Sequence, residues 1–414
     1  MLAHIAYFEA LASIEDETNP EWKSILAGLV VLRLVDSWLD LGTQVVTADV
    51  TGLKAVRHAI AEVFEGDPIR SILYRLIDTL EQTETAGIRA IAPQFIAYGQ
   101  ALQYAESLHL ALDVFVSIRD RAKAVHDNTL AIQAALQVAK ISRNLGNLSE
   151  SDELYLSVIH DAEAAGDIAS SIRAQIGRTD IIATRGDLPA AGKILEDLAE
   201  KAIACGLMDI YGNVLNDRAA LAFKKGDYNL AVRLGYQALE YTRDAIVRDR
   251  ILGDMAVSFA QMGHLSASRD ANLLIAATAQ EQSVRWIALI NLMYTAILEG
   301  HEVAFEQYRS TLAHANMTPR SEAHYRVDAG RGLLKFGRTD LANVELARAR
   351  DLAERYSMNQ LIFEIEAILA QQPVLAASSL KPESWSDDIM AIASTIGEWL
   401  ELQSASTSHM GGVI

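Results

Sequence analysis

Apolar residues recur along most of the chain at intervals of three and four, which is the spacing of an amphipathic helix. Two clear stretches are AIQAALQVAKISRNL and ILGDMAVSFAQM. Strand signals are few, because alternating β-branched runs are scarce and the hairpin pairs Asn-Gly and Asp-Gly do not occur. The pattern therefore predicts an all-α fold.

Short breaks interrupt this pattern at nearly regular intervals. Each break begins at a glycine, and these glycines are Gly146, Gly186, Gly226, Gly263, Gly300 and Gly337. They lie 40, 40, 37, 37 and 37 residues apart. Glycine suits the left-handed residue that ends a helix, and Asn147, Asp187 and Asp227 can cap the helix that follows. Such a period with one internal turn predicts a repeat of two antiparallel helices.

Small residues dominate two columns that keep a fixed distance from these glycines. Seven residues before each glycine stand Ala139, Thr179, Ala219, Ala256, Met293 and Gly330. Five residues after each glycine stand Ser151, Ala191, Ala231, Ser268, Phe305 and Ala342. Two helices can cross closely only where the side chains between them are small, so the columns predict the crossing points of each helix pair.

The chain resembles the tetratricopeptide repeat family in these features. The best match is LNDRAALAFKKGDYNLAVRLGYQAL, residues 215–239, and a seventh copy lies upstream in FIAYGQALQYAESLHLALDVFVSI, where Glu106 replaces the turn glycine. Three features depart from the family pattern. The proline that usually closes each unit is missing, Phe305 occupies the small column, and Asn272 and Arg309 stand where an aromatic residue is usual. The resemblance implies a right-handed superhelical solenoid of the extended, 37–40-residue repeat type.

The repeats cover only part of the chain. We expect a bundle of about four helices over 1–89, seven repeats over 90–356, capping helices over 357–403 and a disordered tail over 404–414. Asn19-Pro20 and Asp67-Pro68 mark the starts of two bundle helices, because a capping residue precedes a proline in both. An open solenoid needs a polar face at each end, and the two flanking segments suit that role.

Charge and composition exclude several classes of protein. The chain has 36 basic and 54 acidic residues, a net charge of −18, whereas nucleic-acid binding needs a basic face. A DNA-reading helix in TADVTGLKAVRHAIAEVF stays an alternative that rests on Lys54, Arg57 and His58. The single cysteine, Cys205, excludes a disulfide framework and Cys-rich metal sites. The first charges are acidic and no long apolar run occurs, so we expect a cytoplasmic protein that does not enter a membrane.

Catalytic and metal-binding motifs are absent from the sequence. It contains no P-loop, no Gly-x-Gly-x-x-Gly and no Gly-x-Ser-x-Gly. His264 and His301 follow turn glycines 37 residues apart, so they are either metal ligands on neighbouring units or solvated turn residues. We therefore predict a protein that is not an enzyme and has neither cofactor nor metal.

The resemblance implies that the first helix of each unit lines a concave groove. Nine residues before each glycine, the groove column holds Gln137, Gly177, Asp217, Asp254, Asn291 and Asp328, and three places later stand Lys140, Asp180, Ala220, Val257, Tyr294 and Arg331. These side chains form either a polar stripe for a peptide with basic residues or local pairs such as Arg250 with Asp254 and Asp328 with Arg331. The predicted partner-binding residues are Gln137, Lys140, Asn213, Asp217, Asp254, Asn291, Tyr294, Asp328 and Arg331.

The sequence thus favours a scaffold or adaptor that binds a protein or an extended, basic peptide in the groove. A second hypothesis is a peptide-gated regulator, since bacterial pheromone receptors share this layout of a helical bundle and about seven repeats. An enzyme with a site in 1–89 is the third. The identity of the partner and the oligomeric state stay open.

Overall fold

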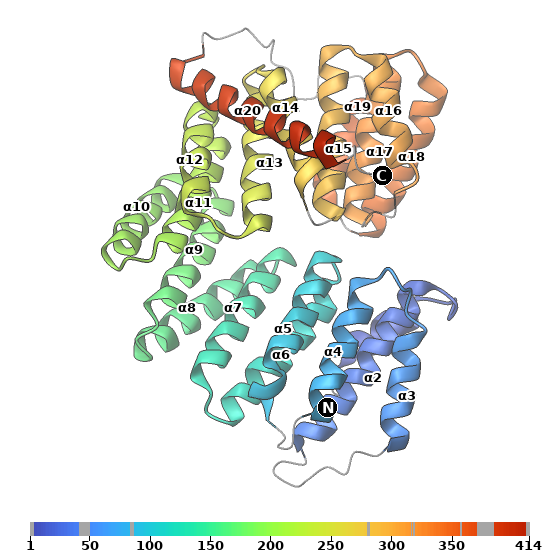
Figure 1. Ribbon diagram of the computed structural model, residues 1–414, viewed down its shortest axis with the longest axis vertical. Helices are drawn as coiled ribbons and strands as arrows, with labels where there is room; N and C mark the ends of the chain where they lie inside the picture. The colour runs from blue at the N-terminus through green and yellow to red at the C-terminus, as the bar shows by residue number, and fades with distance from the viewer. Residues whose placement is uncertain are drawn as a thin grey trace. The chain divides into compact units, whose positions relative to one another are not determined.

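The computed structural model describes residues 4–40, 50–82, 87–279, 282–315, 317, 319–356, 358–370 and 385–410. Within these ranges the chain forms twenty helices and no strand, which confirms the predicted all-α, helix-turn-helix fold (Figure 1). The helices divide into two compact units, Met1–Arg185 and Gly186–Ile414.

In its described ranges, the first unit contains nine helices that follow one another in space as in sequence. They are α1 (Ile5–Ser13), α2 (Pro20–Asp40), α3 (Val50–Ala61), α4 (Pro68–Gln82), α5 (Ile88–Tyr104), α6 (Leu108–Ala124), α7 (Asn128–Asn144), α8 (Leu148–Ala164) and α9 (Ile168–Thr184). The predicted starts of α2 and α4 are confirmed. Asn19 and Asp67 accept hydrogen bonds from the backbone N–H groups two residues later, of Glu21 and Ile69.

A strict 20-residue period runs through the middle of the chain. Helices α5 to α9 each have 17 residues, and three-residue turns join them. Each turn from the one between α5 and α6 to the one before α12 contains one residue with positive φ. These residues recur every 20 positions, at Glu106, His126, Gly146, Gly166, Gly186, Gly206 and Gly226. The 40-residue repeat is therefore two equal helices with two equivalent turns, and the sequence reading identified only every second turn.

Hydrogen bonds show why each turn needs a left-handed residue. At Gly226, with φ of 80°, the Gly226 N–H donates to the Phe223 carbonyl at 2.9 Å. The next N–H, of Asp227, donates to the Ala222 carbonyl at 3.0 Å. This closes the preceding helix in the Schellman manner, and the Asp227 carboxylate accepts from Leu230 to start the next. Asp187 caps in the same way, but Asn147 makes no side-chain capping bond.

Two of these turns carry a residue other than glycine, at Glu106 (φ 58°) and His126 (φ 55°). Both side chains are exposed, so nothing compensates for the steric cost of a Cβ in the left-handed region. We expect Glu106→Gly and His126→Gly each to raise the free energy of unfolding of the first unit by roughly 0.5–1 kcal/mol. Urea denaturation followed by circular dichroism measures this, and Gly146→Ala should shift stability in the opposite direction.

The described part of the second unit contains the remaining eleven helices. They are α10 (Leu188–Ala204), α11 (Met208–Lys224), α12 (Tyr228–Tyr241), α13 (Ala245–Gln261), α14 (Leu265–Thr278), α15 (Gln282–Glu299), α16 (Glu302–Leu312), α17 (Pro319–Lys335), α18 (Thr339–Arg355), α19 (Asn359–Leu369) and α20 (Asp387–Met410). From α11 onward, odd-numbered helices are the first members of each repeat, and even-numbered helices up to α18 are the second members. We call them A helices and B helices.

The change of period from 40 to 37 residues has a local cause. The B helices α12 and α14 have 14 residues rather than 17, and they end at extended residues, Thr242 and Ala279. An arginine from the following A helix replaces the glycine turn at both places. Arg248 donates to the Leu239 and Thr242 carbonyls at 2.8 and 3.2 Å, and Arg285, 37 residues later, donates to the Ala279 carbonyl.

The two predicted columns of small residues are buried. Every residue of both columns is buried, and Phe305 is fully buried. Phe305 fits because a glycine of the next repeat, Gly332 on α17, leaves room for its ring: a Cβ at Gly332 would lie 2.2 Å from a ring carbon. The large residue and the glycine are therefore matched across α16 and α17.

The C-terminal segments differ from the predicted pair of caps. Helix α19 packs on α18, but α20 packs on the B helices α14 and α12 (Figure 1). Ile389, Ile392 and Ile396 of α20 are buried in the cluster formed by those helices. The predicted disordered tail is also wrong for residues 404–410, because α20 continues to Met410, while 411–414 lie outside the described residues.

Candidate functional site

The A helices of the second unit form one continuous layer. Helices α11, α13, α15, α17 and α19 contact one another in that order, and each also packs on a B helix. This layer carries seven of the nine predicted partner-binding residues. Gln137 and Lys140 belong to α7 of the first unit, where Lys140 is exposed and Gln137 accepts a 3.4 Å hydrogen bond from Gln103. The nine residues are thus divided between the two units.

The groove column lies at the junction between each A helix and the preceding B helix. Asn291 on α15 donates to the side-chain oxygen of Asn272 on α14 at 3.3 Å. Gly177, in the same column of the first unit, faces the Tyr155 ring on α8. Tyr155 and Asn272 are both nine residues after a turn glycine. Asn272 therefore replaces the usual aromatic residue and pairs with Asn291.

Asp254 on α13 is the most accessible carboxylate of the column. It is exposed, and its carboxylate has no hydrogen-bond or ion-pair partner among the residues that the structure describes. The helices around it still remove part of its hydration, which raises the pKa of Asp254 to about 6, and Arg250 one turn earlier offsets only part of this effect. The predicted Arg250–Asp254 pair is thus an electrostatic neighbour rather than a bonded pair. A carboxylate in this state is suited to receive a cation.

Asp328 on α17 is already engaged. Arg331 donates to Asp328 and to Glu364 of α19, both at 2.5 Å, and its guanidinium lies 5.3 Å from the centroid of the Tyr294 ring. Burial raises the pKa of Asp328 to about 7, against the attraction of Arg331, and the carboxylate of Glu364 raises it further. The structure brings Tyr294, Asp328 and Arg331 together, and it adds Glu364, which the sequence reading missed because α19 lies outside the repeat register.

Asn213 and Asp217 occupy α11, one helical turn apart, and both are half-buried. In the first unit, α7 and α9 are the corresponding first members of their repeats, and Arg143 of α7 donates to Asp180 of α9 at 2.6 Å. Asp180 stands in the same column as Tyr294 and Arg331. The polar positions of the column therefore connect neighbouring A helices as well as facing solvent.

The two turn histidines have structural surroundings. His264 is 7% exposed, its ring stacks on Trp385 with centroids 4.0 Å apart, and its Nδ1 accepts from the Ala267 N–H at the start of α14. His301 is exposed and makes no capping bond. In the described ranges, no group of three or more His, Cys, Asp or Glu side chains could hold a metal ion.

Arg57, on which the DNA-reading alternative depends, is paired with acidic residues. Its guanidinium donates to Asp78 and Glu81 of α4, each at 2.7 Å. A phosphate would have to compete with both carboxylates.

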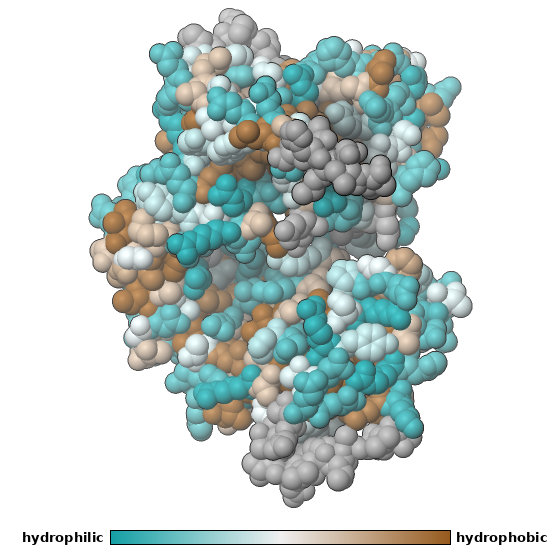
Figure 2. Space-filling model, in the orientation of Figure 1, coloured by the Kyte–Doolittle hydropathy of each residue, from teal (hydrophilic) through white to brown (hydrophobic). Residues whose placement is uncertain are grey.

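Hydrophilic and hydrophobic side chains are interspersed on the face of the molecule in Figure 2. None of the described helices is both long and apolar enough to cross a lipid bilayer.

Comparison with known proteins gives no family assignment. No protein-family model matches the chain, and no curated protein matches it. Among solved structures, NprR in complex with its cognate peptide NprX is 16% identical, covers 77% of this chain and 97% of its own, and has a TM-score of 0.49. The apo form of the quorum sensor NprR from B. thuringiensis is 15% identical, covers 81% of this chain and 99% of its own, and has a TM-score of 0.48. The apo form of RapI is 10% identical, covers 79% of this chain and 98% of its own, and has a TM-score of 0.46. The repeat of paired helices is evident from the chain's own structure.

Proposed function

We propose that the A-helix layer of the second unit binds an extended, basic segment of a peptide or protein, and that the protein acts by binding rather than by catalysis. The observation that carries the proposal is Asp254, an accessible carboxylate without a bonded partner among the described residues, in the middle of a layer of half-buried polar side chains. Its neighbours in register, Asp217 and Asn291, extend the polar surface onto α11 and α15.

The charges of the layer favour a cationic group at one place in particular. Asp328 is compensated by Arg331, whereas Arg250, which is exposed, is the one cation near the carboxylate of Asp254 among the described residues. A lysine or arginine of the partner would complete the hydrogen bonds of Asp254. The excess of acidic residues over the whole chain assists the approach of a basic segment. The proposed compartment is the cytoplasm, where an exposed free thiol such as Cys205 persists.

The test is titration calorimetry with acetylated heptapeptides that carry one or two lysines, and with matched peptides that carry glutamate instead. We expect saturable binding of lysine peptides that weakens as the pH falls through 6, because Asp254 is then protonated. Asp254→Asn should weaken binding about threefold to fivefold, since an exposed ion pair contributes up to about 1 kcal/mol. The same variant should lose most of its dependence on salt and pH.

Asp340→Asn is the matched control. Asp340 is an exposed carboxylate in the first turn of the B helix α18, so this change alters net charge equally but lies outside the A layer. Equal weakening by both variants would show that only the net charge of the protein affects binding. An unchanged affinity of Asp254→Asn would show that the A layer is not the binding surface.

A further inference from the structure

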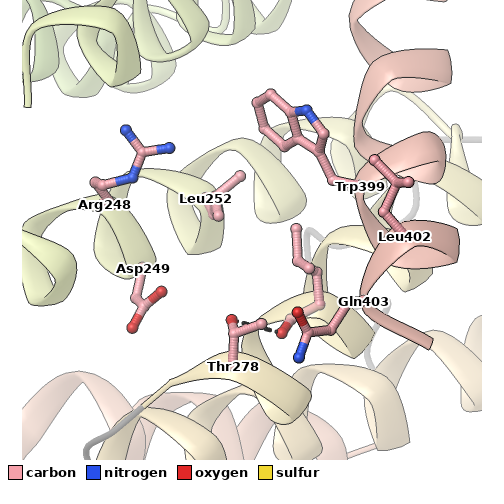
Figure 3. A pocket seen from close by; sticks show the side chains of 8 residues that line it. Arg248, Asp249, Leu252, Thr278, Trp399, Leu402 and Gln403 are labelled. Carbon is pink, nitrogen blue, oxygen red and sulfur yellow. Dashed lines mark hydrogen bonds between the residues drawn. The ribbon is translucent and has the colours of Figure 1, made fainter. Parts of the chain in front are cut away.

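A separate pocket of about 400 Å³ lies in the second unit where α13, α14 and α20 meet (Figure 3). None of the residues that line it belongs to the groove column. Leu252 of α13 and Leu274 of α14 supply an apolar side. Trp399 and Leu402 of α20 stand opposite Arg248 and Asp249 in the close view. The volume suits a small organic molecule.

The wall provided by α20 is held in place from behind. The Trp399 ring stacks on Tyr236 of α12, with centroids 6.1 Å apart and planes 15° apart. Near the other end of α20, Arg233 of α12 is paired with Asp388. Leu402, by contrast, keeps 67% of its surface exposed although it borders the pocket. A molecule in the pocket would cover part of this leucine.

The two charged residues of the pocket, Arg248 and Asp249, differ in their hydrogen-bond partners. The Arg248 guanidinium is bonded to carbonyls at the C-terminal end of α12, where the helix dipole carries partial negative charge. The Asp249 carboxylate has no bonded partner among the described side chains, and burial raises its pKa against the attraction of the neighbouring Arg248. Because the carbonyl groups of α12 already accept the hydrogen bonds of Arg248, the remaining electrostatic preference of the pocket is for a cation.

We propose that this pocket binds a small organic cation, in which an ammonium group pairs with Asp249 and an apolar body lies against Leu252, Leu274, Trp399 and Leu402. Such a ligand contacts α13, α14 and α20 at once. Its binding therefore stabilises the contact between α20 and the repeats, because a ligand favours the state that it binds.

The experiment uses the full chain and tryptamine as the probe, at pH 8, where the ammonium and the carboxylate are both charged. Tryptophol, which replaces the ammonium with a hydroxyl, is the matched control ligand. We expect saturable binding of tryptamine by calorimetry, at least tenfold tighter than that of tryptophol. Hydrogen exchange of the backbone amides of α20 should slow when tryptamine is added.

Two variants probe the two parts of the pocket. Asp249→Asn should weaken tryptamine binding about tenfold, ~1.4 kcal/mol, and leave tryptophol unchanged. Leu402→Ala should weaken both ligands, and its high exposure means that the fold is not at risk. Asp340→Asn, an equal change of net charge on α18 that lines neither the pocket nor the groove column, should change neither.

Each contrary outcome has a distinct meaning. The proposal is overturned if wild type shows no saturable binding of tryptamine, or if tryptophol binds equally well. It is also overturned if Asp249→Asn binds tryptamine like wild type. Loss of binding in Asp254→Asn alone would assign the cation to the groove column instead.

Discussion

Phe305→Ala is expected to lower the free energy of unfolding of the second unit by about 3–5 kcal/mol. Phe305 is fully buried and belongs to the cluster that includes Met293 and Leu333. Removing its ring leaves a cavity between α16 and α17 that these neighbours fill only in part. Urea denaturation followed by tryptophan fluorescence, to which Trp286 beside the same cluster contributes, measures the loss.

A related prediction is that the effect of Gly332→Ala on the free energy of unfolding changes sign when Phe305 is replaced by alanine. In wild type, Gly332→Ala should destabilise the unit, because the new Cβ would lie 2.2 Å from the Phe305 ring. In the Phe305→Ala background that obstacle is gone, and the same change should stabilise α17 by up to ~1 kcal/mol, the difference in helix propensity between glycine and alanine. An equal cost of Gly332→Ala in both backgrounds would show that the two residues are not coupled.

The features of the fold that could be predicted from the sequence are those set by short-range interactions. A turn glycine such as Gly226 and the caps at Asp187 and Asp227 act within a few residues, so the pattern alone places them. The shortening of α12 and α14 has a less obvious signal, the arginines at 248 and 285. They can be recognised only once the bonds to the preceding helix are known.

The position of α20 could not be predicted because it depends on contacts between distant segments. Arg233 and Asp388 are 155 residues apart in the sequence, and Trp385 stacks on His264, 121 residues before it. Neither pair has a local pattern. A terminal amphipathic helix fits the end of a solenoid as well as its B helices, and only the shape of the surface at α12 and α14 decides between them.

The candidate site shows the same division. The repeat register places Asp254, Asn291 and Asp328 at equivalent positions, yet their surroundings differ. Asn291 donates a hydrogen bond to Asn272 of the preceding helix. Asp328 shares Arg331 with Glu364 of the following helix. These partners come from preceding or following helices, so one column contains both an accessible carboxylate and a compensated one.

A second large effect is expected in the first unit, where His4 lies between two carboxylates. Its ring nitrogens are 2.5 Å from Asp113 and 2.9 Å from Asp36, and the residue is 6% exposed. Burial alone would lower the pKa of His4, but the bonds to Asp113 and Asp36 outweigh it and raise the pKa to about 9. Arg121 also pairs with Asp36, so the network joins α2, α6 and the residue that precedes α1.

Because the pKa of His4 is higher in the folded chain than its ordinary value of 6.5, the imidazolium stabilises the fold. The stabilisation is complete below pH 6.5 and is lost as the pH rises through 9. The shift corresponds to about 3 kcal/mol. Hydrogen exchange of the α1, α2 and α6 amides, corrected for the intrinsic effect of pH, should show this loss of stability between pH 6.5 and 9.5.

His4→Gln is the control, since its amide can donate to one carboxylate but carries no charge. This variant should be less stable than wild type at pH 6.5 by about 3 kcal/mol, because both carboxylates lose the imidazolium and only Asp36 keeps a cation, Arg121. Its stability should change little between pH 6.5 and 9.5, so the two profiles should converge at high pH. Parallel profiles would mean that another group titrates in this range and that the charge on His4 does not stabilise the contact between α1 and α6.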